Sequence, residues 1–191
     1  MRKSLLTGVI IFCLLLAVVF ILMRSKPMVP AKPTVAVPPR VGFVTVHLYF
    51  IGADYECLVE KEVQIPKGEL VDMMKEALRR LGEAPAGTGL YSAIPPYDIC
   101  FRDVWVEGDR AYVDLHKGMP SADFTRGYFM GSTGETLGVY SIVNTLTKSF
   151  PRIKNVQILV GGKKAVTITG HMDISEPLEF DSSVVKSGLK K

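Results

Sequence analysis

Two segments that follow a proline-rich stretch alternate between apolar and polar residues, which is the pattern of a strand with one buried face. Residues 44–50 carry valine, leucine or phenylalanine at every second position, and residues 55–65 repeat the alternation after a Gly52-Ala-Asp54 turn. In the second segment the polar positions are mostly glutamates. The pattern therefore predicts two consecutive strands that bury the same side of a sheet.

Two later segments change to the period of an amphipathic helix. Residues 69–81 place Leu70, Ala77, Leu78 and Leu81 on one stripe, and Gly82 ends the pattern. Residues 134–150 form the second predicted helix, because Pro151 cannot continue it.

Four further short segments predict two hairpins. Residues 99–106 and 110–115 flank Glu107-Gly-Asp109, and residues 156–160 and 165–169 flank Gly161-Gly162. Both connections are typical turn sequences. The predicted order is ββαββαββ. It indicates an α+β domain of two layers, with both helices on one face of a mixed or antiparallel sheet.

The N-terminal part has a different composition. Residues 5–23 are mostly leucine, isoleucine, valine and phenylalanine, and a helix of that length is about 28 Å long, close to the thickness of the hydrocarbon core of a bilayer. We therefore expect one transmembrane helix that anchors the chain in the cell membrane. A cleaved signal peptide is the alternative, but the exit sequence Phe20-Ile-Leu-Met-Arg24 offers no small-residue cleavage site.

These patterns divide the chain into segments. A basic tail of residues 1–4 precedes the predicted span, and residues 24–42 form a linker whose prolines favour extended backbone. The predicted domain covers residues 43–180, and residues 181–191 form a basic tail that we expect to be disordered. Basic residues lie on both sides of the span, so charge alone does not decide its orientation.

Charge is distributed unevenly along the chain. The formal net charge is +4, but residues 1–40 hold Lys and Arg without any acid, and the last residues are basic as well. The predicted domain between them is therefore mildly acidic. A domain that binds nucleic acid would carry a basic stripe, so nucleic acid is not an expected partner. The flanking basic residues suit anionic lipid headgroups instead.

The start of the second predicted helix carries a recognisable spacing. Ser132-Thr-Gly-Glu135 has the Ser-x-x-Glu spacing of a capping box, in which hydroxyl and carboxylate satisfy free backbone amides. An anion site is the alternative, since glycines before a helix can cradle phosphate. No lysine stands at the position that a P-loop requires, and Glu135 would repel an anion. We therefore interpret the motif as a structural cap.

Sequence motifs give no catalytic, metal or cofactor site. His47, His116 and His171 lack the spacing of a zinc site, and Asp114 with His116 has no recognisable nucleophile, so a surface pair is the expected role. Cys57 and Cys100 lie in different predicted strands. They could form one disulfide or remain two buried thiols, and the sequence leaves both open.

Two longer phrases resemble the GerMN domain family, which is named after a sporulation and spore-germination protein. They are Gly89-Leu-Tyr-Ser-Ala-Ile-Pro-Pro96, and the helix phrase 131–147 that continues into Val156-Gln-Ile-Leu-Val-Gly-Gly-Lys163. The resemblance covers most of residues 43–178 and implies a non-enzymatic domain outside the cytoplasmic membrane. The family-motif residues, which we expect to form the core or an interface, are Tyr91, Pro95, Pro96, Gly131, Ser132, Gly134, Glu135, Tyr140 and Asn144.

The resemblance predicts a membrane-anchored domain that assembles with other envelope or sporulation-complex proteins, or with copies of itself, during sporulation or germination. An accessory module that binds peptidoglycan or another glycan is the alternative. It would need exposed aromatic side chains in a groove, and the candidates are Tyr49, Tyr91, Tyr97 and Trp105. A hydrolase that uses Asp114 and His116 is the weakest hypothesis.

Overall fold

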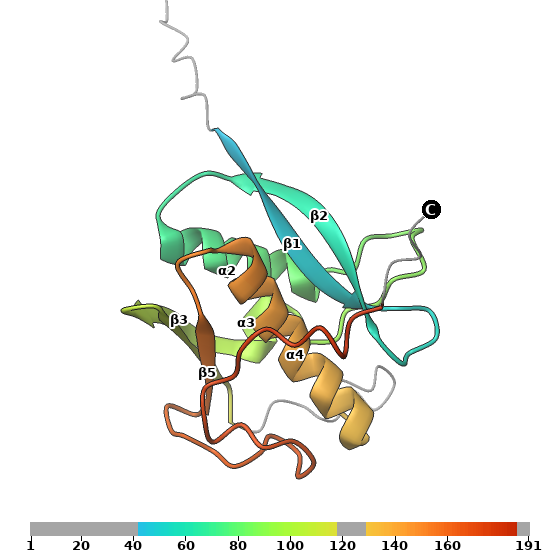
Figure 1. Ribbon diagram of the computed structural model, residues 1–191, viewed down its shortest axis with the longest axis vertical. Helices are drawn as coiled ribbons and strands as arrows, with labels where there is room; N and C mark the ends of the chain where they lie inside the picture. The colour runs from blue at the N-terminus through green and yellow to red at the C-terminus, as the bar shows by residue number, and fades with distance from the viewer. Residues whose placement is uncertain (1–41, 118–128, 187–191) are drawn as a thin grey trace, which may run out of the picture. The chain divides into compact units, whose positions relative to one another are not determined.

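The computed structural model describes residues 42–117 and 129–186, and Figure 1 shows how their helices and strands are arranged. The predicted anchor (5–23) and nearly all of the linker lie outside these ranges. Within the described ranges, no helix has the length and apolar character that a membrane crossing requires. The elements are β1 (Phe43–Ile51), β2 (Leu58–Pro66), α2 (Leu70–Gly82), α3 (Tyr97–Cys100), β3 (Phe101–Glu107), β4 (Arg110–Leu115), α4 (Gly131–Ser149) and β5 (Asn155–Val160).

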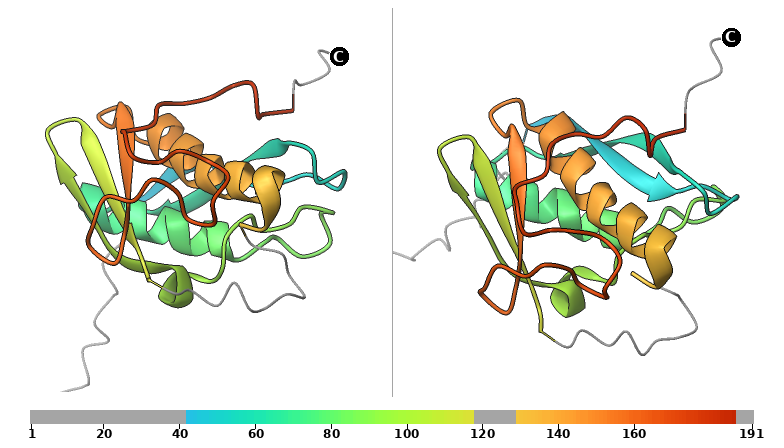
Figure 2. Two further views of the ribbon diagram at one scale, coloured as in Figure 1. Left: turned by 90° about the horizontal axis from the view of Figure 1, so that it is seen from below. Right: turned by 60° about the horizontal axis from the view of Figure 1, so that its bottom comes forward.

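The strands form two separate sheets. β1 and β2 pair as an antiparallel hairpin, and β3, β4 and β5 form a second sheet in that order, with β4 and β5 parallel. The α+β class and the first two strands are confirmed. The prediction of one sheet with both helices on one face is wrong, because α4 contacts both β1 and β5 and lies between the two sheets (Figure 2).

Helix α4 is buried on almost every side. Residues from Leu137 to Leu146 are buried apart from Tyr140, which is half-buried. Helix α2 is instead amphipathic, and its predicted stripe is confirmed by the burial of Met74, Ala77, Leu78 and Leu81. A helix that is apolar or small-sided all round belongs in a core, so α4 is the element around which both sheets pack.

Hydroxyl groups of α4 take the place of a third strand beside β1. The backbone amide of His47 donates to Oγ of Ser149 at 2.8 Å, and that hydroxyl donates to the His47 carbonyl at 3.1 Å. The amide of Tyr49 donates to Oγ1 of Thr145 at 3.2 Å. Buried backbone groups need such partners, so α4 seals this edge of β1 without continuing the sheet.

The second predicted hairpin does not form. β5 is present, but residues 165–169 are irregular and only an isolated bridge joins Val160 to Lys163. The reason is that Glu135 of α4 captures the backbone amides of this segment. Its carboxylate accepts from Ile168 N at 2.7 Å, Thr169 N at 2.9 Å, Thr169 Oγ1 at 2.7 Å and His171 N at 2.8 Å.

The segment after β5, residues 161–186, continues across the domain and is held at intervals by hydrogen bonds. Val156 exchanges both backbone bonds with Leu178, and the Asn144 amide bonds the backbone of Asp181 in both directions at 2.8 and 2.9 Å. Val185 then pairs with Leu58 of β2 as a parallel bridge. Residues 181–186, which we predicted to belong to a disordered tail, are therefore part of the folded domain.

The first predicted hairpin also begins differently. Residues 97–100 form the short helix α3, and β3 starts only at Phe101. Pro96 occupies the N-cap position of α3, and a proline next to the first turn favours helix initiation over a strand. The turn at residues 107–110 and strand β4 agree with the prediction.

Glu135 provides the first testable prediction. The side chain is fully buried. Burial alone would raise the pKa of Glu135, but the hydrogen bonds from Thr169, His171 and Ile168 outweigh it and hold the pKa below its ordinary value of 4.5. The Glu135→Gln variant keeps the shape of the side chain. Its amide NH₂ group is a donor, however, and would face backbone N–H groups that are donors as well. We expect it to lower the free energy of unfolding by about 2–3 kcal/mol at neutral pH.

Urea unfolding of the full chain, followed by the fluorescence of Trp105, measures this loss. Because the folded pKa is lower than the unfolded one, the stabilisation is present above pH 4.5 and is lost as the pH falls through the folded value. The difference between wild type and Glu135→Gln should therefore shrink in acid. The exposed Glu176 lies in the same segment, and Glu176→Gln should have almost no effect. If both variants lost the same free energy of unfolding, the stabilising role assigned to Glu135 would be contradicted.

Candidate functional site

The two family-like phrases meet at one open groove of about 880 Å³. The end of β1, the β1–β2 turn, the end of α2, the loop before α3 and the start of α4 contribute to it, and the turn and loop lie side by side in Figure 1. The groove is lined by Ile51, Tyr55, Gly82, Glu83, Ala84, Tyr91, Ser92, Ala93, Pro96, Met130, Thr133, Gly134 and Leu137.

Tyr91 is the best-anchored aromatic residue of the groove. Its backbone exchanges two hydrogen bonds with Ile51, at 2.8 and 3.0 Å, and so extends β1 by one isolated bridge. Its ring stacks on Tyr55, with centroids 4.9 Å apart and planes inclined by 24°. The neighbouring Tyr91 side chain raises the pKa of the Tyr55 hydroxyl. The backbone thus holds Tyr91 in place while its ring remains open to solvent.

The groove exposes large apolar side chains. Tyr55, Tyr91 and Met130 are 55%, 44% and 44% exposed. Tyr55 also has a left-handed backbone, with φ of 59°, which is uncommon for a residue with a side chain and occurs often at functional sites. Aromatic and methionine side chains that gather at one opening are typical of a recognition surface.

Two glycines allow the loop of Tyr91 to lie between the two helices. A Cβ atom on Gly82 of α2 would lie 3.0 Å from the Pro95 carbonyl oxygen and 3.1 Å from Pro96 Cα. A Cβ atom on Gly138 of α4 would lie 3.2 Å from the Ala93 oxygen and 2.6 Å from the Phe129 ring. Any larger side chain would push the loop away from α2 or α4, so this close packing fixes the groove.

The predicted capping box is wrong. Helix α4 starts at Gly131, its N-cap is Met130, and no side chain caps it. Ser132 and Gly131 are exposed in the first turn, and Glu135 turns inward to the C-terminal segment rather than back to the cap. The sequence spacing was the one that a capping box requires, but the backbone amides of Ile168, Thr169 and His171 bind the same carboxylate instead.

The structure places the family-motif residues in different parts of the domain. Tyr91, Pro96 and Gly134 line the groove. Pro95 is buried behind it, and Glu135 and Asn144 hold the C-terminal segment. Tyr140 is half-buried against a small cluster of Tyr49, Leu58 and Leu137. The sequence did not single out Tyr55 or Met130, although an aromatic residue within a polar turn was a signal that could have identified Tyr55.

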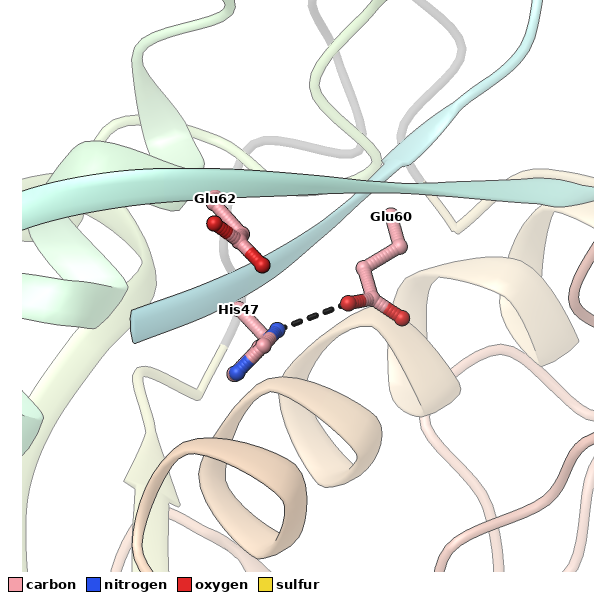
Figure 3. Close-up of side chains that lie close together, drawn as sticks. All are labelled: His47, Glu60 and Glu62. Atoms are coloured by element: carbon pink, nitrogen blue, oxygen red, sulfur yellow. Dashed lines mark hydrogen bonds and ion pairs between the residues drawn. The ribbon is translucent and has the colours of Figure 1, made fainter. Parts of the chain in front are cut away.

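A polar cluster separate from the groove lies on the solvent-exposed face of the β1–β2 hairpin. The side chains of His47, Glu60 and Glu62 point toward one another, with ligand atoms within 4.8 Å (Figure 3). His47 Nδ1 lies 2.7 Å from Glu60 Oε1, and the Tyr49 hydroxyl donates to Glu60 Oε2 at 2.9 Å. Sequence spacing missed this cluster because strand pairing, with His47 opposite Glu62, brings its members together.

Burial raises the pKa of Glu60, but the hydrogen bonds from His47 and Tyr49 outweigh it and lower the pKa overall. Glu60 is therefore ionised at neutral pH. Imidazole and carboxylate groups can bind a divalent ion, yet the hydrogen bonds to His47 and Tyr49 satisfy Glu60 without one. The arrangement acts as an acidic, hydrogen-bonded face of the β1–β2 hairpin.

The remaining candidates have structural roles. Asp114 is buried, pairs with Arg102 at 3.0 Å and accepts from the Gly162 amide at 2.8 Å, so both its oxygens are occupied away from the exposed His116. Cys57 and Cys100 are free thiols. Burial raises the pKa of Cys100, which keeps that thiol protonated and unreactive.

Comparison with solved structures identifies the class of fold. The first GerMN domain of the sporulation protein GerM from Bacillus subtilis has a TM-score of 0.55 and 21% identity, over 71% of this chain and 97% of that one. The structure of the tandem GerMN domains of GerM gives the same TM-score and identity, and this chain spans only 46% of its length. The fold is therefore that of a single GerMN domain.

The sequence agrees with this class. The family model described as Germane, sporulation and spore germination, matches residues 47–166, which is more than half of the chain. This protein belongs to that family. No curated protein sequence matches the chain. The predicted resemblance is thus confirmed, and residues 167–186, which Glu135 and Asn144 hold in place, follow the matched region.

Gly138 provides a prediction for the groove. Replacing a glycine inside a helix with alanine usually stabilises it by about 1 kcal/mol. Here the added methyl group would lie 2.6 Å from the ring of Phe129, which is buried in the core and has little room to move. We expect Gly138→Ala to destabilise the domain by about 1–3 kcal/mol. In urea unfolding, Gly68→Ala is the control, since nothing lies within 4 Å of its Cβ position; stabilisation by Gly138→Ala would refute this packing.

Proposed function

We propose that this chain is a membrane-anchored, non-enzymatic protein that binds other envelope or sporulation-complex proteins, with its domain outside the cytoplasmic membrane. Membership of a sporulation and germination family supports the process. The observation that carries the binding role is the groove, where Tyr91, Pro96 and Gly134 of the family-like phrases meet Tyr55 and Met130.

The chemistry of the groove favours a protein partner. Tyrosine and methionine are enriched at protein interfaces, because they bury a large area with few rotatable bonds or adapt to irregular surfaces. Glu83 is the only charged side chain among the lining residues. An apolar groove with a single acid at its rim suits a partner that inserts an aliphatic or aromatic side chain, rather than a strongly charged substrate.

Cross-linking at the groove tests this proposal. A photoreactive amino acid at position 91 of the full chain should give discrete protein adducts in sporulating or germinating cells. The backbone bonds between residue 91 and Ile51 do not depend on the side chain, so the fold should be kept. Position 105 is the control, because Trp105 stacks on Tyr112 in the other sheet at 5.1 Å. Identical adducts at both positions, or none at position 91, would argue against a protein-binding groove.

A glycan-binding module is a second candidate, because the Tyr55–Tyr91 stack offers an aromatic face beside the groove. Of the other candidate aromatics, Tyr49 is buried, Tyr97 is half-buried and Trp105 lies in the second sheet. Sedimentation with purified cell wall separates the two functions. Co-sedimentation that Tyr91→Ala abolishes and Trp105→Ala leaves intact would favour the glycan, and would replace the protein-docking proposal if no cross-link forms.

The proposed location rests on the apolar segment at residues 5–23. The full chain should stay in the membrane fraction after an alkaline carbonate wash, because a spanning helix does not dissolve in water. The chain without residues 1–23 should be released to the soluble fraction. Protease added to intact protoplasts should digest the domain of the full chain. Protection from that protease would place the domain on the cytoplasmic side instead.

A further inference from the structure

The two edges of the β1–β2 hairpin differ in how far their outward backbone groups are hydrogen-bonded. On β1, the outward backbone groups of His47, Tyr49 and Ile51 bond to Ser149, Thr145 and Tyr91. That edge therefore has no room for another strand. β2 is the other edge of this sheet (Figure 1).

The register shows which groups of β2 face outward. Gly52 bonds to Cys57 and Lys67 to Gly42 across the hairpin, so every second pair, such as Val46–Val63 and Leu48–Lys61, exchanges the inner hydrogen bonds. The backbone groups of Leu58, Glu60, Glu62 and Gln64 consequently point away from β1.

Only the first of these positions is occupied within the part of the chain that the structure describes. The amide of Leu58 donates to the Val184 carbonyl, and the Leu58 carbonyl accepts from Lys186, both at 2.7 Å. The backbone groups of Glu60, Glu62 and Gln64 have no backbone partner among the described residues. This edge thus already accepts one short extended segment, and past it the backbone donors and acceptors are unpaired among residues 42–117 and 129–186.

The charged side chains beside the outer edge of β2 indicate which kind of segment could pair with it. Glu60 and Glu62 are exposed and project from the same face of β2, because residues two apart share a face. Tyr49 and His47 hold Glu60 in position through hydrogen bonds, and the positive charge of Lys148 of α4 also acts on it. A second copy of β2 would bring its own glutamates against these, and like charges across a strand pair are destabilising.

We propose that the outer edge of β2, at Glu60, Glu62 and Gln64, binds an extended peptide segment of another protein by strand addition. Residues of that segment that pair with Glu60 and Glu62 project to the same face as the glutamates. The segment therefore carries lysine or arginine at alternate positions, which gives opposite-charge pairs across the new ladder. This surface is separate from the groove, and the inference does not depend on the proposed function of the groove.

A designed peptide tests the inference on the full chain in neutral detergent micelles. The probe is a fluorescent, end-capped octapeptide of alternating lysine and threonine, and binding is measured by anisotropy. A peptide in which glutamate replaces lysine should bind about tenfold more weakly or not at all. A lysine peptide that is N-methylated at alternate residues loses main-chain donors, and it should also fail to bind.

Variants of the chain then locate the site. The double variant Glu60→Gln, Glu62→Gln should weaken binding of the lysine peptide by about tenfold, and Glu62→Gln alone should weaken it less. The double variant Glu69→Gln, Glu176→Gln removes two acids away from this edge and should bind normally. Trp105 fluorescence confirms that each variant is folded. Binding that survives N-methylation, equal binding of the glutamate peptide, or no effect of the Glu60 and Glu62 changes would overturn the proposal.

Discussion

The buried carboxylate of Glu135 is the constraint on which most of this fold depends. A buried charge is costly unless donors surround it, and here four donors from residues 168–171 do so. Once these amides serve Glu135 they cannot also pair with β5. The chain therefore leaves the second sheet after Val160 and continues as an irregular segment along α4 and back to β2.

Helix α4 explains why the domain has two sheets rather than one. Its Ser149 and Thr145 hydroxyls satisfy the edge of β1, while its other side contacts β5. A strand at this place would have joined the sheets. Serine and threonine inside a helix usually compete with its backbone, but a neighbouring strand gives these two hydroxyls better partners. The same arrangement leaves β2 as the outer strand of its sheet.

Sequence reasoning succeeded where one periodic pattern determined the structure. The alternation in β1 and β2 and the apolar stripe of α2 gave their positions to within a few residues. It failed where distant residues compete for one group. Ser132 and Glu135 have the spacing of a cap, and no local pattern reveals that amides more than thirty positions away along the chain bind the carboxylate. Tyr91 and Pro96 were found through the family-like phrase, whereas Tyr55, Met130 and the His47–Glu62 pair depend on tertiary arrangement.

The cross-strand pair of Ile51 and Leu58 connects the two surfaces. Ile51 bonds through its outward backbone groups to Tyr91 of the groove, and Leu58 bonds through its own to Val184 and Lys186 of the C-terminal segment. The groove loop and the C-terminal segment are thus attached to opposite edges of the same strand pair. Burial of Tyr91 and Met130 would supply affinity that depends little on direction, whereas pairing along β2 fixes register and polarity. Both attachments are made to the same hairpin. A partner that binds at either surface therefore contacts a strand pair whose opposite edge is already hydrogen-bonded within the domain.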